Sequence, residues 1–153
     1  MEFIVEEARK EDLDEIFILQ KVCYISEAEA HGEFDIPPLT ESIDATIQDF
    51  EKGLILIVEV DDEIIASVRA YEEDNTCYIG KLIVRPDFQN RGIGKLLIKE
   101  IEGWFDFCSR YELFTGYKSE KNLYLYNELG YKEFKREKIN KKLTLVYFEK
   151  NND

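Results

Sequence analysis

The sequence predicts one α/β domain, residues 1–153, with a mixed and mostly antiparallel sheet of about seven strands flanked by about four helices. Its length of 153 residues suits a single core, because two cores would each lie near the lower size limit. Hydrophobic residues make up 44% of the chain and aromatic residues 13%, which excludes disorder. Helical and strand periodicities also alternate along the chain, which is typical of α/β proteins.

The N-terminal third is predicted to hold one short strand and two helices. Phe3–Glu7 fits a strand, and apolar residues recur at helical spacing from Leu13 onward. Two adjacent prolines predict that Gly32–Leu39 is a loop. Thr40 is then placed to cap the second helix, which ends near Gly53.

Three strands follow. Leu54–Val60 and Glu63–Tyr71 flank Asp61-Asp62, a pair typical of a tight hairpin turn. A third strand is expected over Thr76–Val84. The chain therefore builds an antiparallel meander in its middle.

The clearest helical pattern is an apolar stripe that starts at Ile93 and continues to Cys108. Trp104 and Phe105 lie on this stripe, so both are predicted to pack in the core.

The C-terminal third is predicted to be strand, helix and hairpin. The strand is Tyr111–Tyr117, and Ser119 can cap a short helix that ends at Gly130 in a left-handed conformation. The final hairpin pairs Tyr131–Lys138 with Leu143–Lys150.

Charge excludes some partners. The formal net charge is −13 and the pI is about 4.6, which argues against nucleic acid and against an anionic membrane. The start of the chain lacks the features of a signal peptide, and Cys23, Cys77 and Cys108 are spaced like reduced thiols. We therefore expect a cytoplasmic protein, monomeric or homodimeric. His31 is the only histidine, and no metal site is expected.

The charge is unevenly distributed. Residues 1–75 contain 22 acidic and 5 basic residues, a net charge of −17, whereas residues 76–153 contain 11 acidic and 15 basic residues, a net charge of +4. The asymmetry suggests different partners for the two halves, but a solubilising acidic surface is the favoured explanation as long as no site has been identified.

A candidate phosphate site lies between the third strand of the meander and the striped helix. Gly92 and Gly94 stand at the helix start, where backbone N–H groups and the helix dipole favour an anion such as a pyrophosphate. Arg91 and Lys95 add positive charge, and Gln89 adds an amide. The spacing matches neither a P-loop nor a dinucleotide fingerprint.

This segment resembles the acetyl-CoA signature of the GNAT superfamily of N-acetyltransferases. The family pattern Gln/Arg-x-x-Gly-x-Gly/Ala is met by Gln89–Gly94. A second segment, Ser119–Tyr131, is similar to the late family motif that ends in Leu-Tyr-x-x-x-Gly-Phe, with Tyr126 on the family tyrosine. The order of elements matches over residues 1–150.

The resemblance implies a donor site and a direct attack of an amine on the thioester of acetyl-CoA, the cosubstrate. Tyr126 would protonate the departing thiolate or hydrogen-bond to it. The loop containing Pro37 and Pro38 would border the acceptor. The residues expected to bind acetyl-CoA are Leu82, Ile83, Val84, Gln89, Asn90, Arg91, Gly92, Ile93, Gly94, Lys95, Ser119 and Asn122.

The general base is left open by the sequence. Many relatives carry a glutamate in the middle of the strand before the signature, but Tyr78–Lys81 has none. Glu72 is taken as the candidate base at the end of the preceding strand. The alternatives are a water chain or one of four other side chains, Glu73, Glu27, Glu29 and His31.

The resemblance thus predicts an enzyme, an N-acetyltransferase acting on a primary amine of a small molecule or peptide, with a cationic acceptor attracted by the acidic half. The alternative is a non-catalytic acyl-CoA-binding or sensing module that kept the donor site and lost the base. An O-acyltransferase or a transferase of longer acyl chains would have the same signature.

Overall fold

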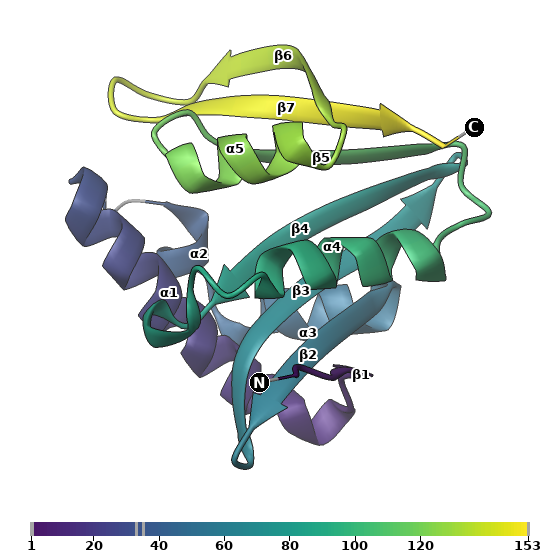
Figure 1. Ribbon diagram of the computed structural model, residues 1–153. Coiled ribbons are helices and arrows are strands. Elements are labelled where there is room, and N and C mark those ends of the chain that lie inside the picture. The colour runs from purple at the N-terminus through teal and green to yellow at the C-terminus, as the bar shows by residue number, and fades with distance from the viewer. Residues whose placement is uncertain (1, 33, 35, 153) are drawn as a thin grey trace.

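All seven strands lie in one mixed sheet. The computed structural model describes residues 2–32, 34 and 36–152, and the strand order is β1-β2-β3-β4-β5-β7-β6 (Figure 1). The strands are β1 (Val5–Glu7), β2 (Leu54–Val60), β3 (Glu63–Glu73), β4 (Thr76–Val84), β5 (Arg110–Gly116), β6 (Lys132–Lys138) and β7 (Thr144–Asn151). Only β4 and β5 pair in parallel, so the predicted mixed, mostly antiparallel sheet is confirmed.

Helices cover both faces of the sheet. They are α1 (Leu13–His31), α2 (Pro37–Thr40), α3 (Ile43–Lys52), α4 (Ile93–Trp104) and α5 (Glu120–Glu128), with short 3-10 turns at Lys10–Asp12 and Pro86–Phe88. Figure 1 shows α4 and α5 in front of the sheet and α1 and α3 behind it. The described residues thus include five α-helices, one more than the sequence predicted.

The extra helix is α2, where the sequence predicted a loop. Pro37 and Pro38 stand in its first turn, where a missing N–H costs no hydrogen bond and the fixed φ of proline suits a helix. The prediction that Thr40 caps the next helix is also wrong, because Thr40 ends α2. Ser42 caps α3 instead, its hydroxyl accepting a hydrogen bond of 3.3 Å from the Asp44 N–H.

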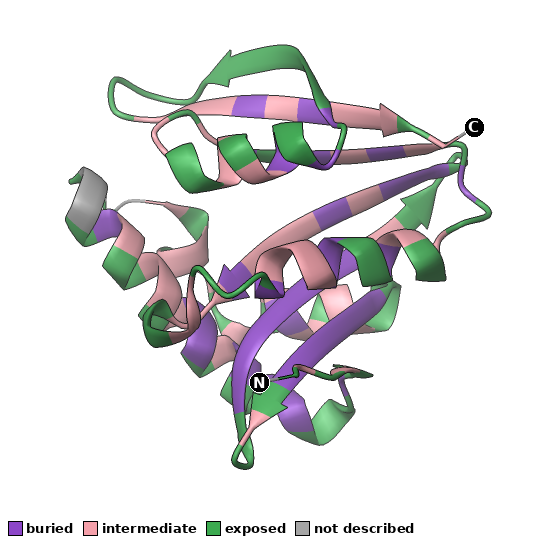
Figure 2. Cartoon of the chain, in the orientation of Figure 1, coloured by how far each residue is buried: buried purple, intermediate pink, exposed green. Residues whose placement is uncertain are grey.

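The sheet is buried on both faces where the helices cover it (Figure 2). In β2, Leu54, Leu56 and Val58 join the core under α4 and α5, whereas Ile55 and Ile57 join the core under α1 and α3. Successive side chains of a strand point to opposite faces, so an uninterrupted apolar run serves both cores.

The prediction for the end of the striped helix is partly wrong. The helix stops at Trp104, and the hydroxyl of Tyr111 donates to the Glu102 and Phe105 carbonyls at that end. Phe105 packs against the core as predicted. Trp104, the last residue of the helix, is 49% exposed and does not pack in the core.

The predicted turns are confirmed. Asp61 and Asp62 have φ of 52° and 64°, as a two-residue hairpin turn requires, and Gly130 follows α5 with φ of 94°. Cys23, Cys77 and Cys108 are free thiols, and none of the described helices is long and apolar enough to cross a membrane.

Candidate active site

A cavity lies where β4 and β5 separate. The two strands pair only through Thr76–Tyr78 and Arg110–Glu112, and from there they diverge toward the left of Figure 1. The cavity has a volume of about 420 Å³ and is walled by β4, β5, α1, α2, α5 and the β6–β7 turn. This volume falls in the range of small-molecule sites.

β4 bulges beside this cavity. Ser67 of β3 pairs with Ile83 and Arg69 pairs with Gly80, so Lys81 and Leu82 together oppose one residue of β3. A bulge bends the strand and increases its twist, which carries this part of β4 away from β5. Lys81 has φ of 50°.

The three β4 residues predicted to hold the donor differ in position. Leu82 lines the cavity. The Ile83 side chain is buried against α1, so only its main chain can meet a ligand. The Val84 carbonyl accepts a hydrogen bond of 3.2 Å from the Gln89 amide.

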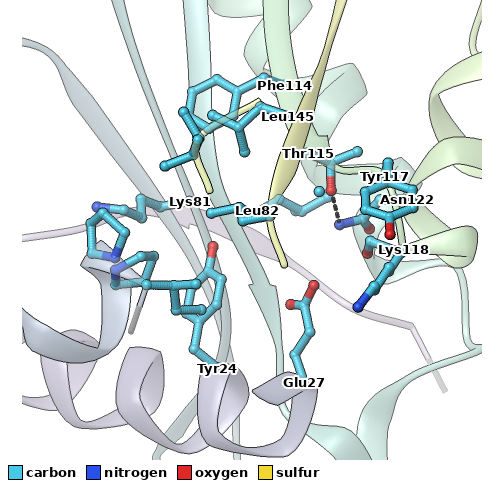
Figure 3. A pocket seen from close by; sticks show the side chains of 18 of the residues that line it. Tyr24, Glu27, Lys81, Leu82, Phe114, Thr115, Tyr117, Lys118, Asn122 and Leu145 are labelled. Atoms are coloured by element: carbon cyan, nitrogen blue, oxygen red, sulfur yellow. Dashed lines mark hydrogen bonds between the residues drawn. The ribbon is translucent and has the colours of Figure 1, made fainter. Parts of the chain in front are cut away.

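Two side chains of α1 enter the cavity from below in Figure 3, Tyr24 and Glu27. Burial and then the Glu27 carboxylate raise the pKa of Tyr24 far above its usual range, so the phenol stays protonated. Glu27 was one of the candidate bases. Tyr24 was missed, although its position three residues before Glu27 places the two on one helix face.

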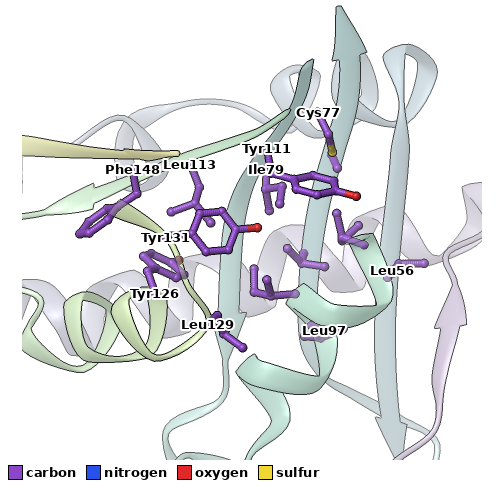
Figure 4. Close-up of a cluster of buried hydrophobic side chains, with 14 of the residues drawn as sticks. Leu56, Cys77, Ile79, Leu97, Tyr111, Leu113, Tyr126, Leu129, Tyr131 and Phe148 are labelled. Carbon is purple, nitrogen blue, oxygen red and sulfur yellow. The ribbon is translucent and has the colours of Figure 1, made fainter. Parts of the chain in front are cut away.

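Tyr126 lines the same cavity from α5. It is 4% exposed, and its ring contacts Tyr131 and Phe148 at centroid distances of 6.2 and 5.8 Å (Figure 4). Burial and then the Glu27 carboxylate raise the pKa of Tyr126 well above its usual range. Tyr126 is therefore a protonated phenol.

Ser119 and Asn122 both line the cavity, as a donor-binding role requires. The Asn122 Nδ2 donates a hydrogen bond of 3.2 Å to Thr115 Oγ1, which ties α5 to β5 (Figure 3). Ser119 occupies the N-cap position of α5, but its side chain makes no capping hydrogen bond to the described residues of the helix.

The glycine segment forms the N-terminus of α4. Gly92 is the N-cap residue, with φ of 79°, and apart from its chain neighbours no atom of the described residues lies within 4 Å of the position that a Cβ would take. The first N–H groups of a helix lack partners within it, so they can donate hydrogen bonds to an anion. Asn90, in the loop that precedes α4, has φ of 63°.

Gly94 and Ile93 have structural roles. A Cβ on Gly94 would lie 3.3 Å from the Leu125 side chain and 3.6 Å from that of Leu82, so glycine here permits close packing of α4 on α5 and β4. The Ile93 side chain is 2% exposed and belongs to the core.

The polar side chains of the signature contact neighbouring residues. Gln89 Oε1 accepts from Lys121 Nζ at 3.1 Å, and Lys95 pairs with Glu128 at 3.3 Å. The Arg91 guanidinium donates to the Asp87 carbonyl at 3.3 Å and lies over the Phe88 ring.

The structure does not bring Glu72 to the cavity. Its carboxylate accepts a hydrogen bond of 2.8 Å from the Asn75 N–H at the β3–β4 turn, and Glu73 pairs with Thr76 at that same turn. Glu29 is exposed on α1, and the side chain of His31 lies outside the described part of the chain. Among the described residues that line the cavity, Glu27 is the one carboxylate.

The charge split of the sequence is not repeated in this cavity. The acidic half contributes one carboxylate to the described lining, and the basic half contributes Lys81, Lys118 and Lys142. Within the described residues, no group of three or more His, Cys, Asp or Glu side chains could hold a metal ion.

The gap between β4 and β5 and the helix that begins after Gly92 bring residues expected to bind acetyl-CoA to one region of the fold. The chain matches the model of the acetyltransferase (GNAT) family over residues 11–131, and it belongs to that family. It is therefore an acetyltransferase whose donor is acetyl-CoA, as the sequence predicted. No curated protein sequence matches the chain.

Solved structures share the fold at low sequence identity. The ribosomal-protein-S18-alanine N-acetyltransferase from Escherichia coli superposes with a TM-score of 0.81 at 12% identity, over 99% of this chain and 95% of that chain. A probable acetyltransferase from Staphylococcus epidermidis has a TM-score of 0.81 at 13% identity, over 99% of this chain and 100% of that chain. The PaiA N-acetyltransferase from Thermoplasma acidophilum, solved with coenzyme A, gives 0.80 at 16% identity, over 99% of each chain.

Proposed function

We propose that this protein is an N-acetyltransferase that acts on a primary amine of a small molecule or a peptide. The observation that carries the proposal is the meeting of Glu27 and Tyr126 in one cavity, at the gap between β4 and β5. One side chain can accept a proton and the other can donate a hydrogen bond, which are the two tasks that aminolysis of a thioester requires.

The chain offers donor-binding groups along one path. The N–H groups at Gly92 and the start of α4 would bind the pyrophosphate, with Arg91 and Lys95 exchanging their present contacts for phosphate oxygens. The main chain at Leu82 and the side chains of Ser119 and Asn122 would hold the pantetheine arm. Acetyl-CoA supplies the thioester carbon that the amine attacks.

Glu27 is the proposed general base. An amine in water is mostly protonated at neutral pH, and it must lose a proton before its lone pair can react. The Glu27 carboxylate would take that proton first, so that the neutral amine can attack the thioester carbon. The second proton, which the nitrogen loses as the N–C bond forms and the C–S bond breaks, would leave with the CoA thiol. Glu27 replaces Glu72, whose carboxylate lies at the β3–β4 turn.

Tyr126 is the proposed partner of the departing sulfur. The raised pKa of this phenol keeps its proton in place, and a neutral phenol donates a charge-assisted hydrogen bond to a thiolate. A group with so high a pKa is a weak acid, so its contribution comes from this hydrogen bond more than from complete proton transfer.

Release of the CoA thiol, measured with a set of primary amines, tests the function. We expect amine-dependent release and an acetylated amine detectable by mass spectrometry. Binding of acetyl-CoA without release by any amine would instead support an acyl-CoA-sensing module. Transfer to alcohols but not to amines would identify an O-acetyltransferase.

A further inference from the structure

Part of the cavity wall is apolar. This apolar wall is formed by Ile36 and α2, by β5 and by the end of the β6–β7 hairpin. Its side chains are those of Ile36, Pro37, Pro38, Phe114, Leu143 and Leu145. In Figure 3, Phe114 and Leu145 lie across the cavity from Tyr24 and Glu27. If the amine of an acceptor contacts Glu27, the rest of the acceptor therefore extends toward these apolar side chains.

Few of the described residues that line this cavity carry negative charge. Among the described lining residues Glu27 is the one acid, whereas Lys81, Lys118 and Lys142 are basic. The Lys81 ammonium is already paired with Glu41 at 2.8 Å. A second ammonium on the acceptor would meet an apolar wall and like charges, and burial of an unpaired charge is unfavourable.

The apolar wall is held in place by buried polar groups. The Gln20 side chain, 0% exposed, donates hydrogen bonds of 2.9 Å to the Pro38 carbonyl and 2.8 Å to the Glu41 carboxylate. Arg69 in turn donates to the Gln20 carbonyl oxygen at 2.8 Å. A wall fixed in this way selects acceptors by shape and polarity rather than by adjusting to them.

From these three observations we infer that the acceptor is a small primary amine with one positive charge on an apolar body, and not a polyamine. The inference rests on the proposed function and narrows it to one substrate class. Glu27 would meet the single ammonium, and the α2, β5 and hairpin side chains would bury the rest.

A pair of isosteric amines tests this inference. n-Hexylamine and 1,5-pentanediamine have the same length. The first ends in a methyl group where the second has a second ammonium. We expect kcat/KM for n-hexylamine to be higher by on the order of 100-fold. From n-butylamine to n-hexylamine it should rise about fourfold per methylene.

Two substitutions on the same sheet locate the effect. Phe114 is 50% exposed and lines the cavity, whereas Phe134 is 41% exposed and is not among the lining residues, and both rings contact Tyr147. Phe114→Glu should lower the ratio of kcat/KM for n-hexylamine to kcat/KM for 1,5-pentanediamine by about tenfold, because the new carboxylate can pair with the second ammonium of the diamine. Phe134→Glu should leave the ratio unchanged. Thermal unfolding of both variants verifies that they are folded.

The outcomes separate this inference from the proposed function. Equal or faster acetylation of 1,5-pentanediamine would overturn the inference and leave an N-acetyltransferase. An unchanged preference in folded Phe114→Glu would also overturn it, because the wall would then not set the selectivity. If neither amine is acetylated while another primary amine of the set is, the inference fails and the proposed function stands. If acetyl-CoA binds and no primary amine of the set is acetylated, the proposed function fails as well.

Discussion

The Lys81 ammonium lies 2.8 Å from the Glu41 carboxylate, and this ion pair joins the bulge of β4 to the segment after α2. Lys81 lies in the stretch of β4 beyond the part that pairs with β5, next to Leu82, which is expected to hold the donor. Glu41 also accepts from the Gln20 amide at 2.8 Å, and Gln20 holds the Pro38 carbonyl. The position of the acceptor wall is therefore coupled to the strand that binds the donor.

Glu41→Gln should weaken acceptor binding. The substitution leaves a half-buried lysine without its counter-charge and loosens α2, at a cost of about 1 kcal/mol, or roughly fivefold in the acceptor KM. The Kd of acetyl-CoA should change less than twofold. Glu133→Gln, which removes an exposed pair with Arg136 on β6, is the control and should alter neither constant. Equal losses for donor and acceptor would contradict the assigned role.

Glu27→Gln should remove the general base. We expect kcat to fall by about 100-fold or more, because proton acceptance by a positioned base contributes about that factor. Glu29→Gln, an exposed carboxylate two residues away on α1, should retain full activity. An undiminished kcat in the folded Glu27 variant would assign the base to another group.

Tyr126→Phe should lower kcat by about 10- to 100-fold, the value of a hydrogen bond to a charged group, with acetyl-CoA affinity within twofold. Tyr124→Phe on the same helix is the control, since that side chain is 71% exposed.

Because burial raises the pKa of Tyr126, the phenol keeps its proton as the pH rises. Activity of the unsubstituted enzyme should therefore show no loss from this group up to about pH 10.

Most of the fold was predictable because its signals are local. The turn at Asp61-Asp62, the break at Gly130 and the strand pattern of β2 each depend on neighbouring residues. The prediction of a loop at Pro37 was wrong, because proline disrupts a helix interior but is accommodated in the first turn of a helix. The prediction for Trp104 was also wrong, because periodicity does not show where a helix ends.

The active site was predictable only in part, for a physical reason. Tyr126 and the glycines belong to continuous motifs, whereas Tyr24 and Glu27 come from α1, about 100 residues earlier, and meet Tyr126 only through the sheet order. Glu72 was chosen because it precedes β4 in the chain. The antiparallel register pairs it with Cys77, at the end of β4 that is still joined to β5.

The three thiols should be unreactive in the native protein. Burial, with a smaller contribution from Glu27, raises the pKa of Cys23 to about 12, so about one thiol in ten thousand is ionised at pH 8. Burial also raises the pKa of Cys77 and Cys108. Ellman's reagent should give negligible colour with native protein and three equivalents in guanidinium chloride. Rapid reaction of one native thiol would show that a core segment opens readily.

Gly92→Ala and Gly103→Ala should have opposite effects, although both glycines belong to α4 or its cap. Gly92 has φ of 79°, where a Cβ costs about 1–2 kcal/mol, and the new methyl group would also enter the space beside the N-terminal N–H groups. We expect a Tm lower by about 2–6 °C and an acetyl-CoA Kd raised at least tenfold.

Gly103 has a helical backbone and open space around its Cβ position. Alanine there should therefore stabilise the fold by about 0.5–1 kcal/mol and leave acetyl-CoA binding unchanged. Calorimetric titration and thermal unfolding measure both quantities. A destabilised Gly92→Ala protein with undiminished affinity would confine this glycine to a backbone role and place the pyrophosphate elsewhere.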